Sequence, residues 1–221
     1  MFVKEKKSYD IFKYQFKEEL EKIFNIADLS DIHKEQKCDF DTLTFETDQS
    51  TNFHKIFYDK IQECNFLTIY KSFIEEVILP QFQQDILYQK IPTFRIQVPN
   101  NISVAEFHKD KTYSHSPYEV NIFLPITYAK DTYTVWSESI EDLGDYAPME
   151  ANYGEYYLWD GANLNHGSKI NTHDLTRISV DFRILPYKDY NEDDVKKTVN
   201  TKTQLKLGSY FNLIEYKTKS Y

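Results

Sequence analysis

The chain has 221 residues, 41% of them hydrophobic, and a formal net charge of −9 from 26 Lys and Arg against 35 Asp and Glu. This length fits one domain with a sizeable core, and an acidic balance without a basic block argues against nucleic acid as the main partner. No apolar run reaches the about 18 residues that a membrane span needs, the N-terminus lacks the apolar core of a signal peptide, and two cysteines in such a chain fit a reducing compartment, so we expect a cytoplasmic protein without a membrane partner.

The first ninety residues are predicted to be mainly helical. Apolar residues in segment 9–26 recur at spacings of three and four, which is the pattern of one buried helix face. Segments 53–63 and 66–82 repeat this pattern, and Pro80 is expected to bend or end the last helix. The polar segment 28–52 is expected to be mostly loop.

From about residue 91 the sequence changes to short runs rich in β-branched and aromatic residues, separated by Pro, Gly, Asn and Asp. The predicted strands lie in segments 93–99, 102–108, 118–127, 133–139, 153–161 and 176–186. Strands at this spacing without intervening helices favour an antiparallel sandwich or a jelly-roll barrel.

The whole chain, 1–221, is interpreted as a single domain. Its predicted parts are a helical region over 1–90, a β core over 91–187 and a C-terminal extension over 188–221. The extension is polar but ends in the apolar cluster YFNLIEY, so we expect it to dock on the core; a disordered extension is the alternative.

The run RISVDFR alternates strictly, which places its residues on two faces of one strand. One face is apolar and comprises Ile178, Val180 and Phe182, and the other is polar and comprises Arg177, Ser179, Asp181 and Arg183. A polar face can simply meet water. Because helices precede these strands, we instead expect the apolar face to pack on the helices and the polar face to line a cavity.

The segment FHKD contains a histidine and a carboxylate two positions apart. On an extended strand, His108 and Asp110 would point to the same side. Two histidines and one carboxylate form the facial triad that binds non-haem iron(II) and leaves open positions. His166, which follows a turn at Asp160-Gly161 and precedes Gly167, is the candidate third ligand. The alternatives are a solvated turn at His108 and a structural histidine at His166.

Arg177 and Ser179 follow His166 and share one face of the predicted strand. A guanidinium and a hydroxyl in this arrangement can bind a carboxylate through charge-assisted hydrogen bonds. Such a group would suit the far carboxylate of 2-oxoglutarate.

The order FHKD, NHG and RISVDFR resembles the HxD…H…RxS signature of iron(II)- and 2-oxoglutarate-dependent oxygenases. The surrounding segments, among them YTVWSES and LWDGANLNHGSKIN, are similar to the small oxygenase family named after a streptomycin-biosynthesis protein, of phytanoyl-hydroxylase-like type. The resemblance covers roughly residues 90–215 and implies a double-stranded β-helix, a jelly-roll or cupin-like barrel of α+β class, with N-terminal helices packed on one sheet.

This resemblance implies roles for individual residues. His108, Asp110 and His166 would hold the iron, and Arg177 with Ser179 would bind the 5-carboxylate of 2-oxoglutarate. Four further residues are candidates for contacts with cosubstrate or substrate: Asn121 for the cosubstrate, and Arg95, His115 and Trp136 for the substrate pocket. The alternatives are a structural amide at Asn121, a surface histidine at His115 and core packing at Trp136.

The implied activity is that of an oxidoreductase, a dioxygenase that uses iron(II), 2-oxoglutarate and O2 and releases succinate and CO2. It would hydroxylate or desaturate a small polar metabolite, such as a sugar or a precursor in the biosynthesis of a secondary metabolite or surface glycan. Related halogenases lack the carboxylate ligand, so Asp110 predicts that halogenation does not occur. A cupin-like metal-dependent isomerase or dioxygenase and a non-catalytic, carbohydrate-binding jelly roll are the alternatives. The sequence fixes neither the substrate nor the oligomeric state.

Overall fold

The computed structural model describes residues 4–44, 47–194, 196–198 and 202–217. The helical elements are α1 (Phe16–Phe24), η1 (Leu29–Asp31), α2 (Ile32–Glu35), α3 (Asn52–Lys60), α4 (Phe66–Phe73), the π-helix η2 (Ile74–Ile78), α5 (Leu79–Phe82), η3 (Asp110–Tyr113) and η4 (Tyr187–Asp189). The strands are β1 (Lys4–Ser8), β2 (Ile86–Gln89), β3 (Thr93–Gln97), β4 (Val120–Pro125), β5 (Val135–Ser137), β6 (Ala147–Pro148), β7 (Glu155–Trp159), β8 (His166–Ser168), β9 (Arg177–Pro186) and β10 (Phe211–Ile214).

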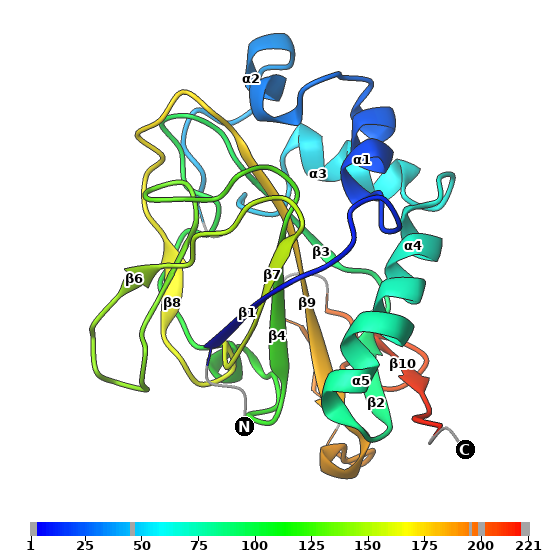
Figure 1. The fold of residues 1–221 in the computed structure, drawn as a ribbon. Helices are drawn as coiled ribbons and strands as arrows, with labels where there is room; N and C mark the ends of the chain where they lie inside the picture. Colours follow the sequence, from blue (N-terminus) through cyan, green and yellow to red (C-terminus); the bar gives the residue numbers. More distant parts are fainter. Residues whose placement is uncertain (1–3, 45–46, 195, 199–201, 218–221) are drawn as a thin grey trace.

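The strands form two antiparallel sheets. The larger has seven strands in the order β1-β7-β4-β9-β2-β10, with β3 also paired to β9, and the smaller has the order β6-β5-β8. Figure 1 shows α1, α4 and α5 on one side of the larger sheet and β6 and β8 on the other. The prediction of helices combined with antiparallel strands is therefore confirmed, whereas the two sheets do not close into a barrel within the described residues.

The long strand β9 lies between the hydrophobic core and a polar cavity on the other side of the sheet. Its residues Ile178, Val180 and Phe182 belong to the main hydrophobic cluster, together with aromatic side chains from the helices. The ring of Phe182, for example, lies 5.0 Å from that of Tyr70 on α4, edge to face. On the opposite face, Arg177, Asp181 and Arg183 line a cavity, as the alternation predicted.

The helical prediction for segment 66–82 is confirmed, with a defect in front of Pro80. The segment runs through α4, η2 and α5 without a break, and the π-helix η2 immediately precedes Leu79. Proline has no N–H and its ring clashes with the carbonyl four residues earlier, and a π-turn is a usual way to accommodate such a defect. The helix ends where Gln83 adopts a left-handed conformation with φ 52°.

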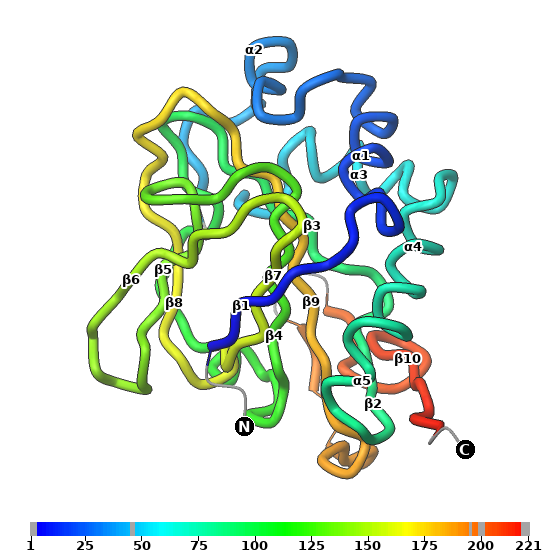
Figure 2. Tube along the Cα trace, in the orientation of Figure 1, coloured from blue at the N-terminus to red at the C-terminus, as the bar shows by residue number. Residues whose placement is uncertain are grey.

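Five strands were not predicted: β1, β2, β6, β8 and β10. β1 has the charged sequence KEKKS and is held by pairing with β7, and β2 and β10 pair with each other. Of the predicted strand 102–108, only His108 makes a β-bridge. Through β10, the C-terminal extension joins the larger sheet beside β2, next to α5 in Figure 2. None of the helices in the described ranges is long and apolar enough to cross a membrane.

Candidate metal centre

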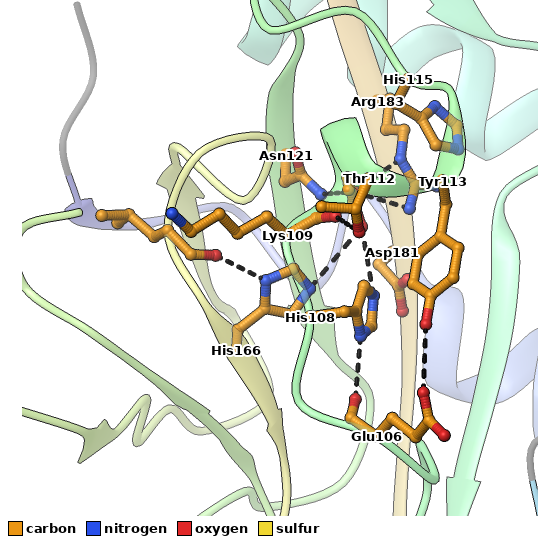
Figure 3. A network of polar contacts seen from close by, with 12 residues as sticks. Glu106, His108, Lys109, Thr112, Tyr113, His115, Asn121, His166, Asp181 and Arg183 are labelled. Carbon is orange, nitrogen blue, oxygen red and sulfur yellow. Dashed lines mark hydrogen bonds and ion pairs between the residues drawn. The ribbon is translucent and has the colours of Figure 1, made fainter. Parts of the chain in front are cut away.

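Two histidines from distant parts of the chain lie directly opposite each other. His108 and His166 exchange both backbone hydrogen bonds, with N···O distances of 2.8 and 2.9 Å. Their rings are 4.5 Å apart, and Figure 3 shows them facing each other. The close approach depends on Gly167, because a Cβ there would lie 2.7 Å from the ring of Phe107. A single cross-strand pair thus brings the two imidazoles together.

Asp110 completes a group of three possible metal ligands. Asp110 was predicted to lie on the same extended strand as His108, but it is the first residue of η3. Its Oδ1 nevertheless lies 3.3 Å from His108 Nε2 and 3.7 Å from His166 Nε2. The three ligand atoms all lie within 4.8 Å of one another. Ligands that meet a metal at right angles with bonds of about 2.1 Å are separated by about 3 Å, so a small inward movement would suit one ion.

Backbone carbonyls set the orientation of both imidazoles. His108 Nδ1 lies 2.9 Å from the carbonyl of Glu106, and His166 Nδ1 lies 2.9 Å from that of Leu164. Because a carbonyl only accepts, each Nδ1 carries the proton and each Nε2 is left as a metal ligand. Burial lowers the pKa of His166 to about 4, against the opposing effect of Asp110, so this imidazole is neutral at physiological pH.

The second oxygen of Asp110 is held by a clamp. Arg183 donates to Oδ2 through Nε at 2.9 Å and approaches it with its second nitrogen at 2.8 Å, and Asn121 Nδ2 donates to the same oxygen at 2.7 Å. Burial alone would raise the pKa of Asp110, but the Arg183 guanidinium holds it well below its usual range. The clamp therefore keeps the carboxylate ionised and turns Oδ1 toward the histidines.

Arg177 is buried, and its hydrogen bonds go to neutral partners. It donates to Ser179 Oγ at 2.6 Å and to Gln97 Oε1 at 3.2 Å, while its Nε has no hydrogen-bond partner among the residues that the structure describes. Burial lowers the pKa of Arg177 to about 10, so it stays charged at neutral pH. The other two buried arginines on this side of the sheet are paired with carboxylates, Arg183 with Asp110 and Arg95 with Asp181.

Two cavities meet at the metal-ligand group. The smaller, about 30 Å³, is lined by all three candidate ligands and by Arg177. The larger, about 310 Å³, is lined at one end by His108 and Asp110 and extends to Tyr210 in the C-terminal part. The site is thus connected both to a buried cation and to a space of the size that small molecules occupy.

The remaining predicted site residues fall into three groups. Arg95 lines both cavities and His115 lines the larger one; at 7% exposure, His115 is not a surface histidine. Asn121 lines the smaller cavity but donates to Asp110, which differs from the expected contact with cosubstrate. Trp136 lines neither cavity: its Nε1 donates to the carbonyl of Asp131, and Lys169 lies over its ring.

The cupin-like alternative requires a further histidine near the metal. His115 does not belong to the ligand group, because its Nδ1 is bound to Glu119 Oε2 at 2.8 Å. Within the part of the chain that the structure describes, the group contains two histidines and one carboxylate. This composition is that of the facial triad.

Sequence reasoning missed three residues that shape the site. Arg183 was assigned only to a strand face, and neither Glu119, which lies 3.7 Å from Arg183, nor Gln97, which orients Arg177, was singled out. The polar face of β9 was a signal for Arg183, since a buried guanidinium needs a carboxylate. Which carboxylate it meets depends on the pairing of β4 with β9.

Comparison with known proteins gives one relative by sequence. The streptomycin biosynthesis protein StrG of Streptomyces griseus is 35% identical over 172 residues, which span 77% of this chain and 80% of StrG. No protein-family model matches the chain.

Several solved structures resemble parts of the fold. The non-heme alpha ketoglutarate dependent carbocyclase SnoK from nogalamycin biosynthesis has a TM-score of 0.47 at 9% identity, over 84% of this chain and 80% of SnoK. The apo form of the non-heme monooxygenase ThoJ has a TM-score of 0.45 at 12% identity, over 81% and 71%. AviO1 from Streptomyces viridochromogenes Tue57 has a TM-score of 0.44 at 11% identity, over 84% and 90%.

Proposed function

This chain belongs to the family of the streptomycin biosynthesis protein StrG, and we propose that it is a non-haem iron(II)- and 2-oxoglutarate-dependent oxygenase that acts on a small polar molecule. The observation that carries the proposal is the convergence of His108, Asp110 and His166 within 4.8 Å. Hydroxylation or desaturation is the proposed reaction, with Asp110 occupying the position that a halogenase would leave to chloride.

The donor set fits iron(II). Two imidazole nitrogens and one carboxylate oxygen lie on one side of the site, and this combination leaves positions for other ligands. The backbone carbonyls behind His108 and His166 and the clamp on Asp110 are the supporting contacts that metal ligands usually have. When bound, iron(II) and 2-oxoglutarate together would supply the electrons that reduce and activate O2, and the keto acid would leave as succinate and CO2.

Arg177 fits the far carboxylate of the keto acid. A buried guanidinium without an anionic partner is costly, and the hydrogen bonds of Arg177 go to a hydroxyl and an amide. A carboxylate in the smaller cavity would supply the missing charge. Because that cavity holds only about 30 Å³, the rest of the keto acid would extend toward His108, Asp110 and His166.

The same proposal covers the architecture. We assign the two sheets to a double-stranded β-helix of this oxygenase class, and the chain to one domain over 1–221. The shared hydrophobic cluster between the helices and the larger sheet supports a single domain, as does the pairing of β10 with β2. A phytanoyl-hydroxylase-like subtype and a cytoplasmic location stay predictions from the sequence.

The test is a screen for succinate formation. Metal-free protein is reconstituted anaerobically with iron(II), supplied with 2-oxoglutarate and candidate small molecules, and exposed to air. The proposal predicts that succinate forms with at least one candidate, whose mass changes by one oxygen or two hydrogens. Asp110→Ala should abolish both signals, whereas Asp142→Ala, an exposed neighbour paired with Lys109, should not. Equal activity of Asp110→Ala, or oxidation of the candidate molecule without any dependence on 2-oxoglutarate, would contradict the proposal.

A further inference from the structure

The larger cavity is walled by four separate parts of the chain. Asp48 and Gln49 come from the loop before α3, Gln89 from the end of β2, and Tyr210 from the residue before β10, while His108 belongs to the metal-ligand group. Its volume of about 310 Å³ is at the small end of ligand sites in proteins. The space therefore suits a molecule of about one ring that reaches the metal.

One wall presents a hydrogen-bond acceptor held in place by a carboxylate. Glu119 Oε2 is 2.8 Å from His115 Nδ1 and also 3.7 Å from Arg183 Nε. A carboxylate oxygen accepts, so Nδ1 carries the proton, and the tautomer with this one proton leaves Nε2 as an acceptor. His115 lines the cavity, and no hydrogen bond of its Nε2 occurs among the described residues. A ligand that donates a hydrogen bond would satisfy it.

Three further polar side chains in the wall each have an atom that meets no hydrogen-bond partner in the described part of the chain. These atoms are Asp48 Oδ1, Gln89 Oε1 and Arg95 Nη1, on side chains that are at most 9% exposed. Another polar atom of each side chain is hydrogen-bonded. Ala105 N donates to Asp48 Oδ2 at 3.2 Å, Gln89 Nε2 donates to the carbonyl of Ile91 at 2.8 Å, and Arg95 Nε donates to Asp181 Oδ2 at 3.3 Å. A buried polar atom without a partner costs about 1–3 kcal/mol, so a small rotation of these side chains that brings the atoms to donors and acceptors on an occupant of the cavity would be favourable.

We propose that this cavity binds a small polyhydroxylated ring, of the cyclitol or monosaccharide class, as the substrate of the oxygenase. A hydroxyl both donates and accepts, so several hydroxyls can serve the acceptors on His115, Asp48 and Gln89 and the donor on Arg95 together. An apolar substrate would leave all four unsatisfied. The inference rests on the proposed function for the role of the ring as substrate, but not for its binding.

Binding is tested without turnover. Saturation-transfer NMR compares the zinc-loaded and the metal-free chain with myo-inositol, scyllo-inositol, D-glucose and D-glucosamine, and with cyclohexanol as a six-membered ring with one hydroxyl. We expect at least one polyhydroxylated ring to bind about tenfold more tightly than cyclohexanol, since an analogue that cannot satisfy buried polar groups is strongly rejected.

Two pairs of variants locate the binding. Asp48→Asn exchanges an acceptor for a donor at constant shape and should weaken binding about tenfold, whereas Asp59→Asn on the exposed side of α3 should not. His115→Phe should have a similar effect, and His173→Phe, a histidine outside both cavities, should have none. Thermal melts confirm that each variant folds. No binding of any polyhydroxylated ring, equal binding of cyclohexanol, or equal affinities of Asp48→Asn and Asp59→Asn would overturn the inference. Ring binding without any succinate formation would instead reject the proposed function alone.

Discussion

Replacement of Arg183 is the sharpest test of how the candidate metal ligand Asp110 is held in place. Three hydrogen bonds and ion-pair contacts reach Asp110 Oδ2, at 2.7, 2.8 and 2.9 Å, and two of them come from Arg183. Arg183→Met leaves a buried carboxylate with Asn121 as its remaining partner on that oxygen. Breaking a buried ion pair in this way costs about 3–5 kcal/mol of unfolding free energy, so the metal-free variant should lose this much in urea denaturation.

The effect on metal affinity separates positioning from charge. Removing a positive charge alone would make the site more attractive to a cation. If Arg183 acts by holding Oδ2 so that Oδ1 faces His108 and His166, its loss should instead weaken metal binding about 10–100-fold. Calorimetric titration of the metal-free protein with Zn²⁺ at constant pH and ionic strength measures this change.

Lys111→Met is the matched control. Lys111 also carries a positive charge and lies one residue from Asp110, but its amine is bound to Glu141 at 2.6 Å and to Asn163 at 3.1 Å. This variant should bind Zn²⁺ as tightly as the unaltered chain or slightly more tightly. Unchanged or tighter binding by Arg183→Met as well would refute the positioning role.

Three other predictions concern stability and packing. Burial lowers the pKa of His54 to about 3, so protonation favours the unfolded chain below pH 6.5, and unfolding free energy should fall by about 1.4 kcal/mol per pH unit from pH 6.5 toward 3; denaturation of His54→Gln across this range should give a shallower slope, and an equal slope would contradict the assignment. Gly161→Ala would place a Cβ 2.7 Å from the amide of Asn121. Crystallography should therefore show that amide displaced from Asp110, and the unfolding free energy should fall by about 1–3 kcal/mol. An Asn121 amide in its original position would mean that the site has room for the added methyl group. Ser168→Ala removes an acceptor shared by two backbone N–H groups at 2.9 and 3.0 Å and should cost about 2 kcal/mol in urea denaturation, whereas a neutral result would mean that water replaces it.

The local features of the site were predictable because they depend on short-range geometry. The polar and apolar faces of β9 follow from the alternation of side chains along one strand, and this placed Arg177 and Asp181 on the cavity side. The grouping of His108, Asp110 and His166 followed from a motif whose chemistry is known.

Other features depend on contacts that no short segment encodes. β1 has the charged sequence KEKKS, which carries no strand pattern, and it exists because β7 offers an edge for pairing. β2 is a run of four residues, too short to be separated from the preceding helical pattern by periodicity. The predicted strand at 102–108 fails because the N–H groups of Ser103 and Val104 donate to the hydroxyl of Ser168 in place of a ladder.

The clamp that Arg183 and Asn121 form on Asp110 could not be predicted from the sequence for the same reason. Arg183 meets Asp110 across 73 positions of sequence, and the pairing of β4 with β9 places Arg183 opposite Asn121, which donates to the same carboxylate oxygen. The alternation of β9 showed that Arg183 faces inward but not which carboxylate it would meet. Long-range ion pairs of this kind require the register of the sheet.

Anaerobic titration of the metal-free protein with iron(II), followed by calorimetry in the presence of 2-oxoglutarate, tests the central claim most directly. If the two imidazoles and the carboxylate hold one ion, the unaltered chain should bind a single equivalent, and Asp110→Ala or His166→Ala should lose that binding. Arg177→Gln should keep the iron but lose the added heat of 2-oxoglutarate. Binding of no iron, or the same stoichiometry and affinity in Asp110→Ala, would contradict the account.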